Sequence, residues 1–506
     1  MAININEKRT ALSSYFLWAT FFLYIFLSGY TMAHHELWAD EIHSWNIAKA
    51  SAGLPDLISN IRYEGHPPVW YVIIWSISKF THDVNYIQAA QLIIASLAVF
   101  LVLFFSSFPL ITRILIPFGY FFLFEYGVLS RNYAIGVLFA LCICLILHKN
   151  FRGKLILYYS LLFLLSNTHL IALLLAFSLH VYFLLLTLEQ KKKTSTIFLH
   201  ILFGALVLLP SLYFILPPSD SQLNTGFWLS KLDIKLVVNL IQPPLRAFVP
   251  IPAWWNYNFW NTQFLLELQS KYPIVKIITV SALIVLPAMI FMVLKDNKKS
   301  LLLFLTNLLV SLIVCVFFLL AAQRYAGFIF LGFIASYWLY CIETPVSRKI
   351  NQLVNILLLV QLTGGFFAVT QDIRFPFSNA YRVKELLKEV PTNEKIVTDY
   401  WALNALAAFT DKPYYVLEMH REMSFLMWDT AFARMTQAPD LYSNGLQYLV
   451  RKEGIKEVYM ISVHSPQNIS RPDPQLFRSY KVKLIDKREG AIEKGGNLYL
   501  YQIRAF

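Results

Sequence analysis

The stretch that decides the fold is Ser14 to Met32, which reads SYFLWATFFLYIFLSGYTM and carries no charged side chain. Its length is close to the roughly 20 residues that an α-helix needs to cross the hydrocarbon of a bilayer. Lys8 and Arg9 precede it, and no small-residue cleavage site follows it. We therefore expect this stretch to remain as a first membrane helix instead of being removed as a signal peptide.

The rest of the chain has the same apolar character. Hydrophobic residues make up 57% of the sequence and charged residues only 14%, with a mean hydropathy of +0.53. A chain of this composition must be solvated mainly by lipid. We predict a mainly α, polytopic membrane protein with about 11 to 13 transmembrane helices. The candidate segments are Ser14 to Met32, Pro67 to Phe80, Tyr86 to Phe105, Ile111 to Tyr126, Asn132 to Leu147, Leu155 to Leu165, Leu170 to Leu188, Ile197 to Leu216, Pro273 to Leu294, Leu301 to Ala321, Tyr325 to Cys341 and Ile350 to Val369.

Charge indicates the orientation of these helices. The net charge is +13, and many cations lie in short loops such as Lys191 to Lys193 and Lys298 to Lys299. Basic loops favour the cytoplasm, so this pattern indicates membrane anchoring and no nucleic-acid partner. It places residues 219–272 and everything after Val369 on the extracytoplasmic side. A cytoplasmic N-terminus and a cytoplasmic loop at Lys149 require an even number of membrane crossings between them, whereas the candidate segments give an odd number. Pro109, Pro117 and Gly119 could break the stretch 106–131 into two short helices or a re-entrant pair.

We divide the chain into a transmembrane domain, residues 1–370, and an extracytoplasmic α/β domain, residues 371–506. The outer loop 33–66 shows helical patterns that suggest helices lying on the membrane surface. The outer loop 219–272 is rich in proline and tryptophan and predicts an ordered cap; its tryptophans are Trp228, Trp254, Trp255 and Trp260. In the C-terminal domain, helices are expected at 382–389, 403–409 and 446–452, and strands at 395–399, 457–461, 481–485 and 497–503.

Two acidic residues, Asp40 and Glu41, follow the first helix and carry the chemical hypothesis. Such a pair can also be an ordinary solvated pair attracted to a helix N-terminus. At the other end of the same loop, Pro67 and Pro68 open an apolar segment and fix His66 at the bilayer surface, because proline is tolerated in the first turn of a helix.

This arrangement of Asp-Glu, a short loop and His-Pro-Pro resembles the GT-C superfamily of glycosyltransferases. It is most similar to the branch of protein O-mannosyltransferases and the lipid A aminoarabinose transferase. Ser130-Arg131-Asn132-Tyr133 is similar to the Arg-x-Tyr element of that family, and Gln323-Arg324-Tyr325 stands at the outer end of a late helix. The resemblance extends, in order and spacing, to about Cys341.

The resemblance implies an inverting transfer of a sugar from a polyprenyl-phosphate donor to an acceptor outside the cytoplasm. Asp40 would be the general base, because a hydroxyl is a poor nucleophile until a carboxylate takes its proton. Glu41 would position the acceptor or tune Asp40. Cations would stabilise the leaving phosphate, and the candidates are His66, Arg324, Arg131 and His43. Further candidates for substrate binding are Glu64, Tyr133, Tyr325, Glu125 and Trp38.

The sequence departs from the family at Ala134, Ile135 and Gly136, where many members have an aspartate. A second acid must then come from Glu125, from Glu64 or from nowhere, which leaves metal dependence open. We see no nucleotide-sugar motif and no Asp-x-Asp metal site. The acceptor could be a glycolipid, a glycan or a protein, and the enzyme is expected in the plasma (inner) membrane.

Two other functions fit the architecture. A flippase for lipid-linked oligosaccharides would place charges along a path through the membrane and show repeated halves, whereas the acids here gather in one outer loop. A glycan polymerase or ligase would transfer a chain instead of a single sugar. Nothing in the C-terminal domain looks catalytic, and we interpret Asp399, Tyr400, Glu418 and His420 as ordinary surface polar groups.

Overall fold

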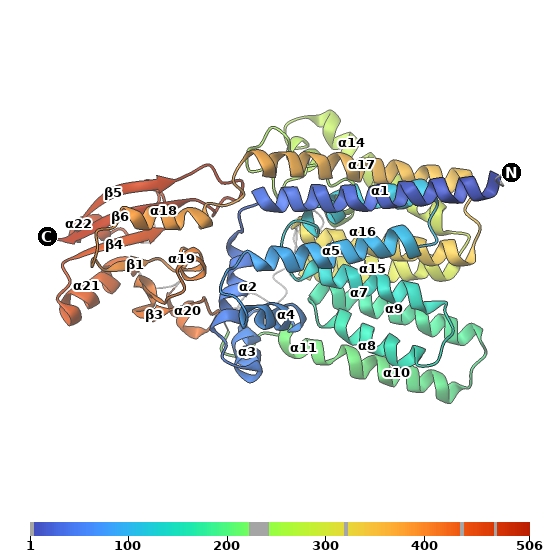
Figure 1. The fold of residues 1–506 in the computed structure, drawn as a ribbon, viewed down its shortest axis with the longest axis horizontal. Coiled ribbons are helices and arrows are strands. Elements are labelled where there is room, and N and C mark those ends of the chain that lie inside the picture. The colour runs from blue at the N-terminus through green and yellow to red at the C-terminus, as the bar shows by residue number, and fades with distance from the viewer. Residues whose placement is uncertain (1–4, 222–241, 318–321, 436–439, 470–472) are drawn as a thin grey trace. The chain divides into compact units, whose positions relative to one another are not determined.

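The computed structural model describes residues 5–221, 242–317, 322–435, 440–469 and 473–506 (Figure 1). The chain separates into two compact units. The helical unit comprises Met1–Ala33, Gln88–Ile215 and Phe227–Gln371, and the loop–sheet unit comprises His34–Ile87, Leu216–Gly226 and Asp372–Phe506. The first outer loop therefore belongs to the same compact unit as the C-terminal domain, although it precedes that domain by some three hundred residues of chain.

Among the described residues, eight helical stretches are long and apolar enough to cross a membrane. They are Ser13–His34 in α1 (Ile5–His34), Tyr86–Phe105 (α5), Leu170–Glu189 (α9), Thr194–Ile215 (α10, Thr194–Leu208, with α11, Pro210–Ile215), Pro273–Leu294 (α14), Lys298–Val316 in α15 (Lys298–Phe317), Gln323–Glu343 (α16) and Arg348–Arg374 (α17). Three further apolar helices are shorter, namely Val69–Ser78 (α4), Tyr133–Leu147 (α7) and Lys154–Ser166 (α8). The predicted mainly α, polytopic architecture is confirmed, with fewer full-length spans than expected.

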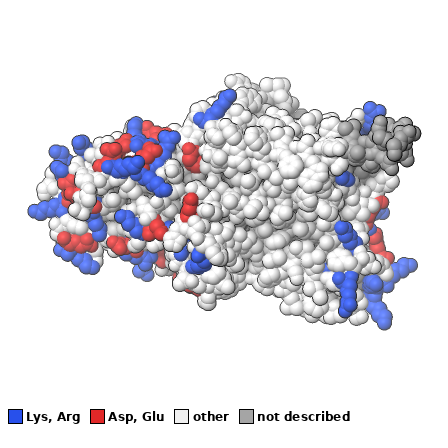
Figure 2. Space-filling view, viewed as in Figure 1, with Lys and Arg blue, Asp and Glu red and all other residues white. Residues whose placement is uncertain are grey.

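The surface of the helical unit agrees with this composition. Figure 2 shows a broad face of that unit almost without Lys, Arg, Asp or Glu, and basic side chains gathered at one of its ends. Such a face is suited to contact with lipid, because hydrocarbon offers no partner to a charged group.

The stretch 106–131 is broken, as its prolines and glycine predicted. Three short helical pieces follow one another, α6 (Leu110–Leu115), the 3₁₀-helix η2 (Ile116–Phe118) and the π-helix η3 (Phe121–Glu125). Pro109 precedes the first piece, Pro117 lies in the second, and Gly119 takes an extended conformation. A π-helical turn is rare and occurs often at functional sites. Here it ends at Glu125.

The C-terminal domain is built on a six-stranded sheet of order β3-β2-β1-β4-β6-β5. Its strands are β1 (Ile396–Thr398), β2 (Tyr414–Val416), β3 (Arg421–Met423), β4 (Glu457–Ser462), β5 (Tyr480–Arg488) and β6 (Leu498–Ala505). Strand β1 pairs in parallel with β2 and β4, and the other pairs are antiparallel. The associated helices include α18 (Val383–Lys388), α19 (Leu403–Thr410) and α21 (Leu441–Glu453).

This sheet agrees with the predicted α/β domain, but β2 and β3 were not predicted. Both strands have only three residues. A run of that length is too short to show the alternation that identifies a strand. The core on one face of the sheet is formed by Val458 and Met460 of β4 with Leu446 and Leu449 of α21.

The first outer loop folds into α2 (Ala39–Ala50), α3 (Leu54–Asn60), the short η1 (Ile61–Tyr63) and α4. Every residue of α2 from Glu41 to Ala48 is buried, because the helix packs against both α4 and α19. Asn46 donates a hydrogen bond to the carbonyl oxygen of Asn404 at 3.0 Å, and Lys49 donates one to that of Ala407 at 2.9 Å. The loop is helical as predicted, and α2 is a core helix of its unit.

The second outer loop is described only in part. Trp228 lies outside the described residues, while Trp254 and Trp255 are exposed and in edge-to-face contact. A short helix, α13 (Phe264–Leu268), begins after Gln263, whose side chain accepts a hydrogen bond from the amide of Leu266.

Candidate functional site

The two neighbouring acids of α2 have different environments. The side chain of Glu41 is fully buried; its Oε2 atom accepts a hydrogen bond from the Trp38 amide at 2.9 Å and lies 3.1 Å from Nε2 of His35. Glu41 thus caps its own helix, and Trp38 is the buried N-cap residue. Asp40 is half-buried in the same first turn. Of the two acids, Asp40 is therefore the one that a solute can approach.

His35 links the beginning of α2 to the end of α17. Its Nδ1 atom lies 2.9 Å from a carboxylate oxygen of Asp372, and both side chains are fully buried. Burial opposes a charge on the imidazole, but the carboxylates of Asp372 and Glu41 outweigh it and raise the pKa of His35 to about 10. A buried imidazolium held between two carboxylates therefore fixes the position of α2. We call His35, Glu41 and Asp372 the His35 cluster.

The structure also joins two of the predicted residues into a buried pair. Nε2 of His43 lies 2.9 Å from Oε2 of Glu64, and their side chains are 9% and 5% exposed. The hydroxyl of Tyr71 donates to the same oxygen at 3.4 Å. The other oxygen of Glu64, Oε1, is buried and has no hydrogen-bond partner among the described residues. His66 is half-buried two positions further along, after Gly65 in the left-handed conformation at φ 67°.

The C-terminal domain brings a further carboxyl group into the surroundings of Asp40. Burial raises the pKa of Glu493, and the charge of Asp40 raises it further. Glu493 lines a small cavity together with Ala39 and Ile42 of α2 and Trp401 of the C-terminal domain. The sequence analysis considered only Glu64 and Glu125 as a second acid. Glu493 was missed because nothing in its local sequence connects it with a loop so far away in the chain.

The remaining predicted residues lie in the helical unit, where Glu125 is buried. Its carboxylate accepts hydrogen bonds from the hydroxyl of Tyr120 at 2.9 Å and from the indole nitrogen of Trp260 at 3.2 Å. The guanidinium carbon of Arg324 lies 5.8 Å from the centre of the Trp260 ring and 5.2 Å from that of Tyr325. We call these five residues the Glu125 cluster. It combines one acid, one cation and aromatic rings, a set of groups suited to an anionic, ring-containing ligand.

A glycine positions the first turn of α16, which carries Arg324. The hydroxyl of Tyr126 donates to the carbonyl oxygen of Arg324 at 2.6 Å. A Cβ atom on Gly327 would clash with that hydroxyl, so any larger residue would displace it. Arg131 is half-buried just before α7, and the ring of Tyr133 lies 4.6 Å from that of His169 and 6.5 Å from that of Tyr325.

The interpretation of Asp399 and Tyr400 as surface groups is wrong. Asp399 and Tyr400 are fully buried, and Asp399 accepts hydrogen bonds from the Ser462 hydroxyl at 2.5 Å and the Val463 amide at 2.9 Å. These bonds join the carboxyl ends of β1 and β4. Glu418 is half-buried with its Oε2 atom fully covered, and desolvation together with the charge of Asp399 raises its pKa to about 8. A buried acid after a strand looks the same in sequence as a loop acid, which explains the error.

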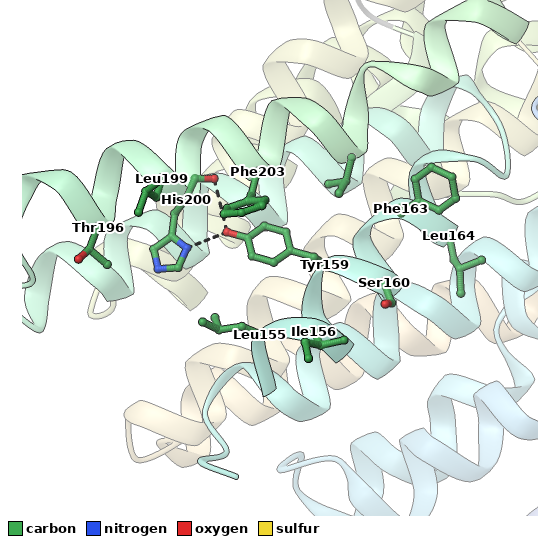
Figure 3. A pocket seen from close by; sticks show the side chains of 11 residues that line it. Leu155, Ile156, Tyr159, Ser160, Phe163, Leu164, Thr196, Leu199, His200 and Phe203 are labelled. Carbon is green, nitrogen blue, oxygen red and sulfur yellow. Dashed lines mark hydrogen bonds between the residues drawn. The ribbon is translucent and has the colours of Figure 1, made fainter. Parts of the chain in front are cut away.

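The helical unit also contains an apolar groove between α8 and α10, with a volume of about 840 Å³ (Figure 3). Leu155, Ile156 and Phe163 of α8 face Leu199 and Phe203 of α10 across it. The hydroxyl of Tyr159 crosses the groove and lies 2.8 Å from Nδ1 of His200 and 3.5 Å from the carbonyl oxygen of the same residue. Its lining is suited to a hydrocarbon chain.

Among the described residues, no group of three or more His, Cys, Asp or Glu side chains could hold a metal ion. No protein-family model matches the sequence, and no curated protein matches it. Function is therefore inferred from the geometry of these residues.

Proposed function

We propose that this protein is an inverting glycosyltransferase. It moves a sugar from a polyprenyl-phosphate donor to an acceptor hydroxyl on the extracytoplasmic face of the plasma (inner) membrane. The observation that carries the proposal is the contrast within α2, where Glu41 is fully engaged in the fold and Asp40 remains half-buried at the first turn.

Asp40 accepts the proton of the acceptor hydroxyl in this reaction. The acceptor oxygen forms a bond to the anomeric carbon while the bond from that carbon to the phosphate oxygen breaks. The leaving phosphate keeps the electron pair, and attack from the opposite side inverts the anomeric centre. Glu41 acts through the fold, because it holds the helix that carries Asp40. General-base catalysis of this kind contributes about 10² to 10⁴-fold in rate.

The developing charge on the phosphate requires cations or hydrogen-bond donors. In the loop–sheet unit, His66 and His43 are the candidates, and Nε2 of His43 lies 2.9 Å from Oε2 of Glu64. In the helical unit, Arg324 and Arg131 are the candidates, and Arg324 already lies against the aromatic rings of the Glu125 cluster. The eight apolar helices support a donor that is itself dissolved in the membrane.

The Asp40→Asn variant tests the proposal. In vesicles containing the purified protein and a radiolabelled polyprenyl-phosphate sugar, we expect transfer to fall by about 10² to 10⁴-fold, because the amide cannot act as a base. Asp56→Asn is the matched control, since Asp56 stands in the first turn of the neighbouring helix α3 and is exposed. Its activity should be unchanged.

Undiminished transfer by Asp40→Asn, in protein whose thermal unfolding matches the wild type, would disprove the assignment. Mass spectrometry of lipids that copurify with the protein tests the donor class separately. A bound prenyl-phosphate sugar supports the proposal. Vesicles that move a lipid-linked oligosaccharide across the bilayer without forming a new glycosidic bond would show a flippase instead.

A further inference from the structure

A second candidate binding site lies within the C-terminal domain. A cleft of about 1050 Å³ is bounded by η6 (Leu417–Met419), α20 (Thr430–Met435) and α21. Helix α21 contributes Asn444, Gln447, Tyr448 and Arg451 to it. These positions are spaced three or four residues apart and so form one face of the helix. The volume is close to the upper end of the range of pockets that bind small molecules.

The charge of this cleft is strongly positive. Arg434, Arg451 and Lys452 line it, and the only acid among the described lining residues is Glu418. Within the described part of the chain, neither Arg434 nor Arg451 forms an ion pair with a carboxylate. Cations that are not neutralised by the protein attract an anionic ligand.

Glu418 provides an independent indication of a ligand. Its Oε1 atom accepts a hydrogen bond from the Tyr400 amide at 3.0 Å, whereas Oε2 is buried and has no hydrogen-bond partner among the described residues. Buried polar atoms are normally hydrogen-bonded, so an exception that lines a cleft indicates a missing partner. Since the pKa of Glu418 is raised to about 8, the group carries a proton at neutral pH and can donate it to a ligand oxygen.

The remaining lining groups are those that bind sugars. Tyr448 lies nearly parallel to His420, at a ring distance of 5.8 Å and an interplanar angle of 25°, and to Tyr415 at 6.5 Å and 16°, so aromatic rings gather at this side of the cleft. The ammonium group of Lys452 lies 5.0 Å from the centre of the Tyr448 ring. The side-chain amides of Asn444 and Gln447 are exposed in the cleft and can both donate to and accept from hydroxyl groups.

We propose that this cleft binds an acidic saccharide. Arg434, Arg451 and Lys452 contact its carboxylate groups, the amides of α21 contact its hydroxyl groups, and Tyr448 stacks on a sugar ring. The inference does not depend on the proposed transferase activity, because the measurement that tests it is binding and not turnover.

Isothermal titration calorimetry of the full chain in detergent micelles tests the site, with an oligogalacturonate tetramer as probe and neutral cellotetraose as its uncharged counterpart. We expect the acidic tetramer to bind and cellotetraose to bind at least about tenfold more weakly, because each charge-assisted hydrogen bond contributes strongly. Arg451→Gln should weaken binding of the acidic tetramer about tenfold. Lys483→Gln removes an exposed cation of β5 outside the cleft and should leave binding unchanged.

The proposal would be overturned if the protein bound both tetramers with equal affinity or bound neither of them. It would also be overturned if Arg451→Gln and Lys483→Gln weakened binding of the acidic tetramer equally. Tyr448→Ala separates stacking from charge, since it should weaken both tetramers by a similar factor. Inorganic phosphate alone should not displace the acidic tetramer at equal concentration. Full displacement would show a general anion site instead of a saccharide site.

Glu418→Gln tests the role assigned to the buried acid. Asp399 from the end of β1, Tyr442 of α21 and the cations of the cleft are the charged or titratable groups around it. Binding by the wild type should weaken as pH rises above about 8, because Glu418 then becomes an anion facing an anionic ligand. The Gln variant should bind equally from pH 7 to pH 9. A wild-type affinity that is constant over this pH range would show that Glu418 does not contact the ligand.

Discussion

The His35 cluster and the Glu125 cluster both bury carboxylates completely, but they satisfy them in different ways. In the loop–sheet unit, Glu41 and Asp372 face a histidine whose pKa is raised to about 10, so a positive charge lies between the two acids. In the helical unit, Glu125 accepts hydrogen bonds from two neutral donors, a phenol and an indole.

This difference separates a structural acid from a candidate functional one. A buried carboxylate with its own counter-charge is part of the fold, and removing one partner leaves an uncompensated charge in the interior. Glu125 accepts its hydrogen bonds from neutral donors, while the cation of its cluster, Arg324, lies against the rings of Trp260 and Tyr325, so the carboxylate can still receive a proton or a cation from a ligand. Burial of an acid is therefore not enough to identify a site, and the partners of the acid decide its role.

The largest effect on stability is expected from His35→Ala. The variant leaves Glu41 and Asp372 buried together without their cation, and we expect the unfolding free energy to fall by about 3 to 5 kcal/mol. Denaturant unfolding in detergent micelles measures it. An unchanged denaturation midpoint would show that the imidazolium of His35 does not stabilise the fold.

The stability of the loop–sheet unit should also depend on pH through His35. Its pKa is about 10 in the folded protein, compared with the ordinary value of 6.5 that applies to the unfolded chain. The contribution of His35 to the free energy of unfolding is therefore complete below about pH 6.5 and is lost as the pH rises toward 10. Thermal unfolding measured from pH 6 to pH 10 should show this decline. The decline should be absent in His35→Ala, and a parallel decline there would assign it to another group.

The two clusters can be compared directly by converting an acid into an amide in each. Glu41→Gln removes the charge opposite the imidazolium and should cost about 1.5 to 3 kcal/mol of stability. Glu125→Gln keeps an acceptor oxygen for Tyr120 and Trp260, so it should cost less than about 1 kcal/mol. If Glu125 takes part in donor binding, the second variant should nevertheless transfer sugar more slowly. A larger loss of stability in Glu125→Gln than in Glu41→Gln would reverse the comparison.

The smallest effect on stability is expected at an exposed ion pair of the loop–sheet unit, formed by His82 and Asp411. Nδ1 of His82 lies 2.5 Å from a carboxylate oxygen of Asp411, but the His82 side chain is 66% exposed. Water and salt screen such a pair, so His82→Ala should change the unfolding free energy by less than about 1 kcal/mol. A loss of unfolding free energy comparable to that of His35→Ala would show that burial does not determine how much these ion pairs stabilise the fold.

Much of the architecture follows from local sequence. Apolar runs of sufficient length predicted the membrane-crossing helices, and Pro109, Pro117 and Gly119 predicted the break before Glu125. In the C-terminal domain, the expected helix at 403–409 and strand at 457–461 agree with α19 and β4. These features depend on the length and hydropathy of apolar runs and on the backbone preferences of proline and glycine. All of these can be identified from residues that are close together in the sequence.

The sequence by itself determined that the chain is a mainly α, apolar protein with an α/β domain at its C-terminal end, because periodicity and hydropathy are local properties. Only the tertiary structure decided which acids are fully buried and which are half-buried. His35 and Asp372 are 337 positions apart, and Glu493 approaches Asp40 from the other end of the chain. Contacts between such distant residues leave no local pattern, since they arise only when packing brings the segments together.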